Sequence, residues 1–173
     1  MVKSRHYVKQ AAFGLCAILA AFIITKTILD ATRCRNNLRN NLSNGIQLYR
    51  LAHEGLYPSD INSVASAFPG LERSKTNTDI LMGRLTCPGN ESRLFRTTND
   101  SVIGDYIYIN WGPHFGTNAI PMDYPLIYDR RLANHWGLGV NVLTSSRSFW
   151  DFRAKWLKNF SLNHPEYRLP MPE

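Results

Sequence analysis

The feature that most constrains this chain is a long apolar run near its amino end. Residues 11–29, "AAFGLCAILAAFIITKTIL", contain one charged side chain, Lys26, close to the end of the run. A helix needs about 20 predominantly apolar residues to cross a bilayer, and a lysine near the end of a span can extend its ammonium group to the interface. The run therefore predicts a transmembrane helix to which the rest of the chain is attached.

Charge placement predicts the orientation of this span. The leader, residues 1–10, carries Lys3, Arg5 and Lys9 and no acidic residue. Basic residues before a span favour an amino terminus in the cytoplasm, with the body on the other side. A cleaved signal peptide is the alternative, because a basic start and an apolar core suit both. Bulky Ile28 and Leu29 and a poor cleavage pattern favour a retained anchor.

Residues 30–55 continue the helix beyond the membrane. Apolar residues recur there at three- and four-residue steps, the pattern of an amphipathic helix, at Leu38, Leu42, Ile46, Tyr49 and Ala52. Gly55 supplies a stop signal and Pro58 follows it. A continuous helix from Gln10 to Glu54 would have a length of about 67 Å.

Residues 56–162 predict a small head that packs on this helix. A short helix capped at Ser59 or Asp60 comes first, with an apolar face of Ile61, Val64, Ala65 and Phe68. Alternating or turn-bounded segments then predict strands at Tyr106–Trp111, in "YPLIYD", and in a hairpin of Gly139–Leu143 with Arg147–Trp150. A strand runs into a helix near Asp151. The fold class is α+β, a long amino-terminal helix packed on a small antiparallel sheet, with a proline-rich tail at 163–173 that is extended or frayed.

The charge and cysteine content of the chain limit the partners and binding sites that we expect. Beyond residue 29 the chain has 16 basic and 13 acidic residues, a charge of +3, which is too small to indicate a nucleic-acid partner. The three cysteines, Cys16, Cys34 and Cys87, show no metal-ligand spacing. A bridge between Cys34 and Cys87 is conceivable if the body faces an oxidising compartment, although spacing alone does not decide it.

A series of short motifs follows the same order as in a known protein group. The motifs are Cys-x-x-Asn-Leu-Arg, "GLYP", "LTCPG", "YIYINWG" and "NHWGLGVNVL", and they contain Cys34, Asn37, Leu38, Arg39, Tyr57, Pro58, Cys87, Pro88, Asn134, His135 and Asn141. They resemble the bacterial type IV pilin-like and type II secretion pseudopilin superfamily, in particular the prepilin-like proteins named for a histidine, nine residues and Asp-Gly. The resemblance implies a non-enzymatic structural protein without a cofactor. It also implies a single-pass protein of the bacterial inner membrane whose head lies in the periplasm or outside.

Two departures from that family's pattern carry predictions. Ser145 and Ser146 stand where the family has Asp-Gly, a pair that favours a tight hairpin turn, so we expect a different turn type or a longer loop.

The glycine that precedes the apolar helix in the family is also missing. Cutting after Gly14, the nearest one, would leave about 22 Å of apolar helix for a core about 30 Å thick. We therefore expect an uncleaved protein. Two functions remain as alternatives, an accessory subunit of a pilus or secretion system and a pilin-like protein that no longer assembles.

Two further hypotheses come from other functional classes. The first is that the head binds an anionic or carbohydrate ligand through Arg130, Arg131 and Trp136. Further aromatic rings of the same face would be Tyr106, Tyr108, Trp111, His114, Phe115, Tyr124 and Tyr128. The alternative is that these aromatic residues belong to the hydrophobic core, where such residues are more often found. An enzyme would need His114, His135, Asp123 and Asp129, or a serine near His135, to form a site. Neither H-E-x-x-H nor G-x-S-x-G supports one. We expect no catalytic or metal site, and the bilayer and other spanning or pilin-like helices as partners.

Overall fold

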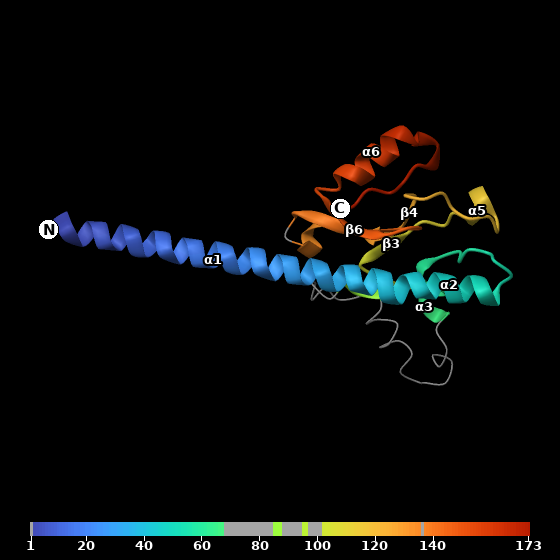
Figure 1. The fold of residues 1–173 in the computed structure, drawn as a ribbon, viewed down its shortest axis with the longest axis horizontal. Coiled ribbons are helices and arrows are strands. Elements are labelled where there is room, and N and C mark those ends of the chain that lie inside the picture. The colour runs from blue at the N-terminus through green and yellow to red at the C-terminus, as the bar shows by residue number, and fades with distance from the viewer. Residues whose placement is uncertain (1, 68–84, 88–94, 97–101, 136) are drawn as a thin grey trace.

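A computed structural model describes residues 2–67, 85–87, 95–96, 102–135 and 137–173. The chain forms a long helical rod with a small head packed against the rod's second half (Figure 1). The rod consists of the helix α1 (Val2–Asn37), the π-helical segment η1 (Leu38–Leu42) and the helix α2 (Ser43–Ala52). The predicted α+β class, a long amino-terminal helix on a small antiparallel sheet, is confirmed.

The part of α1 that precedes the head projects away from it, and its large apolar side chains from Phe13 to Ile24 are exposed. Phe13 is 80% exposed, Phe22 67% and Ile24 55%. Phe22, Ile23 and Ile24 are all exposed, and because successive side chains point about 100° apart, they cover more than half of the helix circumference. Among the described residues, one helix is long and apolar enough to cross a membrane, with a mean hydropathy of 1.9 over an 18-residue stretch.

The second half of the rod buries a straight row of side chains against the head. Cys34, Leu38, Leu42 and Ile46 are all buried and lie four residues apart. In an α-helix of 3.6 residues per turn, residues at that spacing drift around the axis. The wider turn of η1 offsets this drift and keeps the row facing the sheet. The rod ends at Ala52, just before the predicted stop at Gly55, which has a φ of 87°.

The helix α3 (Ile61–Ser66) follows the rod and begins at the predicted cap. The carboxylate of Asp60 accepts a hydrogen bond of 2.8 Å from the backbone amide of Ser63. Val64 is fully buried against the core. Phe68, which was predicted to share this face, lies outside the described residues.

Four antiparallel strands form the sheet in the order β3-β4-β5-β6, namely Tyr106–Tyr108, Pro125–Asp129, Gly139–Thr144 and Ser148–Phe152. The first strand is shorter than the predicted Tyr106–Trp111. Beyond it, the amide of Ile109 still donates to the carbonyl of Leu126 at 2.9 Å. The indole of Trp111 then donates a hydrogen bond of 2.7 Å to the carbonyl of Pro125, and the short helix α5 (Gly112–Phe115) follows. A separate pair, β1 (Phe95–Arg96) and β2 (Val102–Ile103), completes the strands described.

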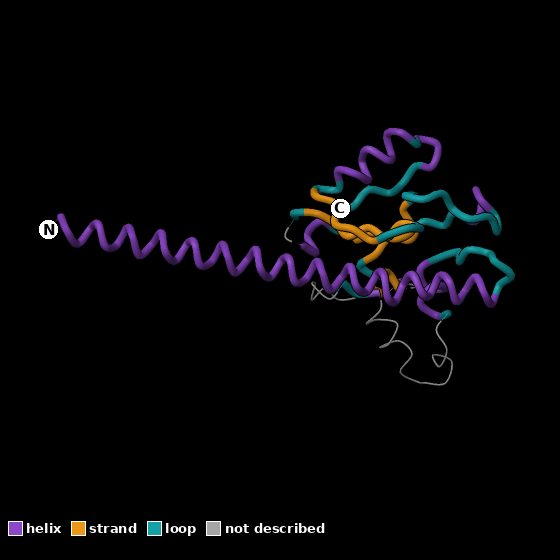
Figure 2. The backbone as a smooth tube through the Cα atoms, viewed as in Figure 1, coloured by secondary structure: helices purple, strands orange, loops and turns teal. Residues whose placement is uncertain are grey.

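The sheet lies between the rod and the helix α6 (Lys155–Asn163), as Figure 2 shows. Ile127 and Leu143 belong to the core cluster that contains Leu38 of the rod. Their neighbours Tyr128 and Val142 belong to a second cluster, together with Leu157 of α6. Helices therefore cover both faces, which explains why every residue of β5 is buried.

The hairpin between β5 and β6 turns through the two serines without the backbone conformation that Asp-Gly favours. Neither Ser145 nor Ser146 has a positive φ. Instead, the hydroxyl of Thr144 accepts hydrogen bonds from the amides of Ser146 (3.3 Å) and Arg147 (3.1 Å). The expected change of turn type is confirmed, and a threonine side chain stabilises the turn that replaces it.

The carboxyl-terminal segments are docked on the sheet. Asp151, at the end of β6, accepts hydrogen bonds from the amides of Trp156 (2.8 Å) and Leu157 (2.9 Å) and so caps α6. After α6 comes the 3-10 turn η4 (Pro165–Tyr167). The amide of Glu173 donates to the carbonyl of Arg130 at 2.8 Å, and Leu169 is only 7% exposed. The tail is therefore fixed to the head. Of the two predicted forms of the tail, extended or frayed, the structure does not have the frayed one.

Candidate functional site

A buried polar cluster lies at the ends of β4 and of the 3-10 segment η3 (Leu132–His135) and in β5. It consists of Asp129 at the end of β4, His135 in η3 and Asn141 in β5, all fully buried. The imidazole Nε2 of His135 lies 3.0 Å from Oδ2 of Asp129. The backbone amide of Asn141 donates to the same oxygen at 2.6 Å, and its side-chain amide does so at 3.1 Å. We call these three residues the junction cluster.

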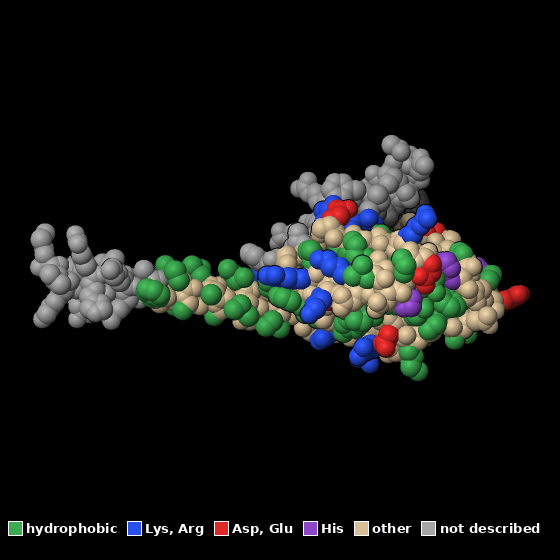
Figure 3. Space-filling view, turned by 90° about the horizontal axis from the view of Figure 1, so that it is seen from above, with side chains coloured by type: hydrophobic (Ala, Val, Ile, Leu, Met, Phe, Trp, Pro, Cys, Tyr) green, Lys and Arg blue, Asp and Glu red, His purple; other side chains and the backbone are tan. Residues whose placement is uncertain are grey.

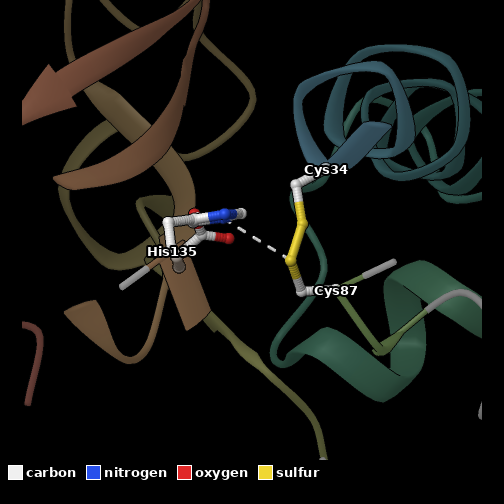
Figure 4. A group of neighbouring side chains, drawn as sticks. Cys34, Cys87 and His135 are labelled. Carbon is white, nitrogen blue, oxygen red and sulfur yellow. Dashed lines mark hydrogen bonds and ion pairs between the residues drawn. A yellow bond between two sulfur atoms is a disulfide. The ribbon is translucent and has the colours of Figure 1, made fainter. Parts of the chain in front are cut away.

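A disulfide lies directly against the junction cluster. Cys34 of the rod is bonded to Cys87, with 5.3 Å between their Cα atoms, a separation that suits a bridge. Sγ of Cys87 lies 3.5 Å from Nε2 of His135 (Figure 4). The conceivable bridge of the sequence analysis is thus formed in this structure, and it fastens the segment around residue 87 to the rod.

A second set of buried contacts ties the same segment to β3. Asp105 accepts a hydrogen bond of 2.8 Å from the amide of Cys87. Asn37 of the rod donates at 3.0 Å to the hydroxyl of Tyr106. Burial raises the pKa of Tyr106 well above its usual value, and the negative charges of Asp129 and Asp105 raise it further. Tyr106 therefore stays neutral at physiological pH and donates its proton within this network.

The residues around the bridge form the one group that suits a metal ion among the described residues. Cys34, Cys87, Asp129 and His135 place ligand atoms within 4.8 Å of one another. Two thiolates, an imidazole and a carboxylate are ligands that zinc accepts. The bridge, however, occupies both sulfur atoms, so this ligand set exists only when the disulfide is reduced.

The histidines and serines of the enzyme hypothesis lie in different parts of the head. His135 and Asp129 form a pair that is fully enclosed and has no surface for a substrate. Ser145 instead donates to the carbonyl of Pro121 at 2.8 Å, and His114 packs against Trp111 in an aromatic cluster. Among the described residues, no serine is hydrogen-bonded to His135, whose Nε2 lies near Asp129, Asn141 and Cys87, so these residues contain no Ser-His-Asp relay.

The two arginines of the binding hypothesis already contact other groups of the same chain. The guanidinium of Arg130 donates to the carbonyl of Gly104 at 3.1 Å, which ties β4 to the start of β3. Arg131 lies 3.6 Å from the carboxylate of Glu173. Trp136 lies outside the described residues. Of the aromatic residues named with them, Tyr106, Trp111 and Tyr128 are buried in the core.

The motif residues of the family resemblance are mostly internal. Cys34, Asn37, Leu38, Pro58, Cys87, Asn134, His135 and Asn141 are buried, Tyr57 is half-buried, and Arg39 is exposed. Pro88 lies outside the described residues. The buried positions bring together the rod, the segment around residue 87 and the ends of β4 and β5, so this set of motifs describes how the head is joined to the rod.

Sequence reasoning missed two carboxylates with structural roles, Asp105 and Asp151. Asp105 stands directly before β3 and Asp151 stands four residues before the first helical residue of α6. The partner of Asp105 is the backbone amide of Cys87, which only the folded chain brings within reach, whereas the backbone amides that bind Asp151 are those of the nearby Trp156 and Leu157. Acidic residues next to predicted strand and helix ends were the available signal, because such positions often supply caps.

No known protein family, no curated protein and no solved structure matches the chain.

Proposed function

We propose that this protein is a single-pass membrane protein with its amino terminus in the cytoplasm of a bacterium and its head in the periplasm or outside. One observation carries the proposal: from Phe13 to Ile24 the rod exposes large apolar side chains around its circumference, while its other half contributes to the core of the head. Water would oppose exposure on that scale, whereas a bilayer favours it. The basic leader gives the orientation, and a disulfide in the head suits an oxidising compartment.

Within this frame, the protein acts as a pilin-like structural component, an accessory subunit of a type II secretion or type IV pilus-like system. The support is the arrangement itself: a rod that is both anchor and spine of an antiparallel head, with the motif residues at the joint. The buried His135–Asp129 pair and the caps stabilise a head and offer no open catalytic centre in the described residues. Function then depends on association between rods.

Cys16 provides a direct test of rod association, because it is an exposed free cysteine on the apolar half of α1. Membranes that contain the full chain are treated with a mild oxidant and separated without reducing agent. Rods that meet along this face are expected to give a disulfide-linked dimer, which Cys16→Ser abolishes. A parallel fusion of alkaline phosphatase to the carboxyl terminus reports the side on which the head lies.

Together, the phosphatase and cross-linking results distinguish the membrane anchor from the association between rods. Active phosphatase together with a Cys16-linked dimer supports an assembling subunit. Active phosphatase without a dimer, at a membrane density where a known dimeric span is cross-linked, would refute association through this face. An inactive phosphatase fusion, with an active cytoplasmic reporter at the same point, would refute the proposed orientation.

A second candidate function, a membrane-anchored binding module for a carbohydrate, is favoured by an open groove of about 360 Å³ on the head. Tyr124, Trp156 and Phe160 supply aromatic surface, and Asn159 and Asn163 supply amide groups. Aromatic surface with a few polar groups is typical of small-ligand sites. Soluble oligosaccharides titrated against the full chain should change tryptophan fluorescence, and Trp156→Ala should remove the response. Binding that Trp156→Ala leaves unchanged would reject this groove.

A further inference from the structure

A cavity of about 320 Å³ lies where the rod enters the head. One wall is a stripe of the rod that runs from Ile24 to Arg35, and the opposite wall is built from Leu138, Trp150 and Phe152 of the β5–β6 hairpin and the residue before it. The volume falls in the range of about 300–1,000 Å³ that is typical of ligand sites. The cavity is therefore large enough to hold part of a small molecule.

The walls of this cavity are mainly apolar, although Thr27, Thr32 and Asn141 also line it. The side-chain amide of Asn141 donates to the carboxylate of Asp129 at 3.1 Å. Thr27 and Thr32 lie on the rod wall, and their hydroxyls donate to the carbonyls of Ile23 and Ile28, both at 2.8 Å. Because these bonds are internal to the helix, the hydroxyls are already satisfied. An occupant of the cavity meets mainly hydrocarbon, so it must itself be apolar.

The position of the cavity along the rod indicates where such an occupant comes from. Ile24 and Ile28 lie within the predicted span 11–29, and both are exposed. Arg35 is six residues beyond its end, about 9 Å along the axis, whereas the headgroup layer of one leaflet is about 5–7 Å thick. Helical side chains tilt toward the amino terminus, so the guanidinium of Arg35 is directed back toward the headgroups.

The mouth of the cavity is positively charged. Among the described residues, no carboxylate forms an ion pair with Arg35. Arg35 is the cation in the cavity lining, and the guanidinium of Arg153, which is not part of the lining, lies 5.3 Å from the ring centre of the lining residue Phe152. Figure 3 shows Lys and Arg side chains near the end of the head where the exposed part of the rod emerges. A mainly apolar interior with a cation at the mouth complements a lipid with a phosphate.

We propose that this cavity binds one acyl chain of an anionic phospholipid of the surrounding bilayer, with the lipid phosphate at the guanidinium of Arg35. The inference rests on the proposed membrane anchor. A bound lipid would add a contact between the head and the bilayer, because it contacts the rod on one side and the β5–β6 hairpin on the other.

The test uses the full chain reconstituted into vesicles that contain equal amounts of phosphatidylglycerol and phosphatidylcholine. After extraction in mild detergent and washing, mass spectrometry counts the phospholipid retained per chain. Phosphatidylglycerol should exceed phosphatidylcholine. Arg35→Gln should lower its retention about fivefold, the effect of one cation near a charged membrane surface, and Ala31→Leu, which fills the cavity from the rod wall, should lower the retention of both lipids.

Two matched variants control for charge and for size. Arg39→Gln removes an exposed arginine outside the cavity, and Ala21→Leu enlarges an exposed alanine of the span; both should retain lipid like the unmodified chain. Far-UV circular dichroism checks that each variant folds, and Arg35→Gln keeps the test decisive if Ala31→Leu does not fold.

Retention that neither Arg35→Gln nor Ala31→Leu changes, or equal retention of the two lipids, would overturn the proposal. So would a lipid-free dimer that Ala31→Leu dissociates, because a second copy would then fill the cavity. An alkaline wash of the same vesicles tests separately whether the chain is anchored in the bilayer. A chain that stays in the vesicles but retains no specific lipid refutes only the lipid site, whereas a chain that the wash removes refutes the anchor.

Discussion

Removal of the disulfide between Cys34 and Cys87 should destabilise the head strongly. The two cysteines are 53 residues apart in the sequence. In the chain-entropy description, closing a loop of that length in the unfolded state corresponds to about 4 kcal/mol at 25 °C. Domains of this kind unfold with about 5–15 kcal/mol, so the double variant Cys34→Ala/Cys87→Ala should lose a large part of its stability.

Urea unfolding of the full chain in mild detergent, followed by tryptophan fluorescence, measures this loss. With an m-value of about 2 kcal/mol per molar, the unfolding midpoint should fall by about 2 M. Cys16→Ala is the control, because Cys16 is exposed and unpaired, and its midpoint should not move. A shift of less than about 0.5 M in the double variant would refute the claim that the bridge restricts the unfolded chain.

Three further predictions concern the head. Asp151→Ala removes the cap of α6 and should lower the free energy of unfolding by about 1–2 kcal/mol in the same urea assay; no loss would contradict the capping role. Burial raises the pKa values of Tyr106, Tyr108 and Tyr128. The folded head therefore keeps phenol protons that the unfolded chain releases above about pH 10. The free energy of unfolding should fall as the pH rises beyond that value. Ionisation of these tyrosines near pH 10 in an ultraviolet titration of the folded chain would contradict their burial. Gly139→Ala places a Cβ atom 2.5 Å from the carbonyl oxygen of Asp151 and should cost about 1–3 kcal/mol in thermal unfolding; an unchanged melting temperature would contradict this close approach.

The sequence predicted the elements whose signals are local. The rod follows from an apolar run joined to a periodic one, and the hairpin follows from alternation with a turn cluster, so neither needs knowledge of distant contacts. The cap at Asp60 is also local, because its partner Ser63 is three residues away.

The contacts between distant segments were not predictable in the same way. Beyond the first strand, the indole of Trp111 donates to the carbonyl of Pro125, 14 residues further on, and no local pattern predicts this contact. The pairing of His135 with Asp129 was one of several combinations that the sequence allowed. The cavity beside Ile24 arises only because the β5–β6 hairpin packs next to the rod, and no pattern in either segment indicates a space between them.

The central claim is that the exposed half of the rod anchors the head in a membrane. Alkaline extraction of membranes from cells that make the full chain tests it most directly, with Ile18→Lys/Phe22→Lys as the disrupted span and Asn40→Lys as a matched control on an exposed polar site. Each lysine near the centre of the span costs about 2.5–3.5 kcal/mol of insertion. The account predicts that the unmodified chain and Asn40→Lys stay in the membrane pellet while the double variant is released. Recovery of the intact, unmodified chain in the supernatant would contradict it.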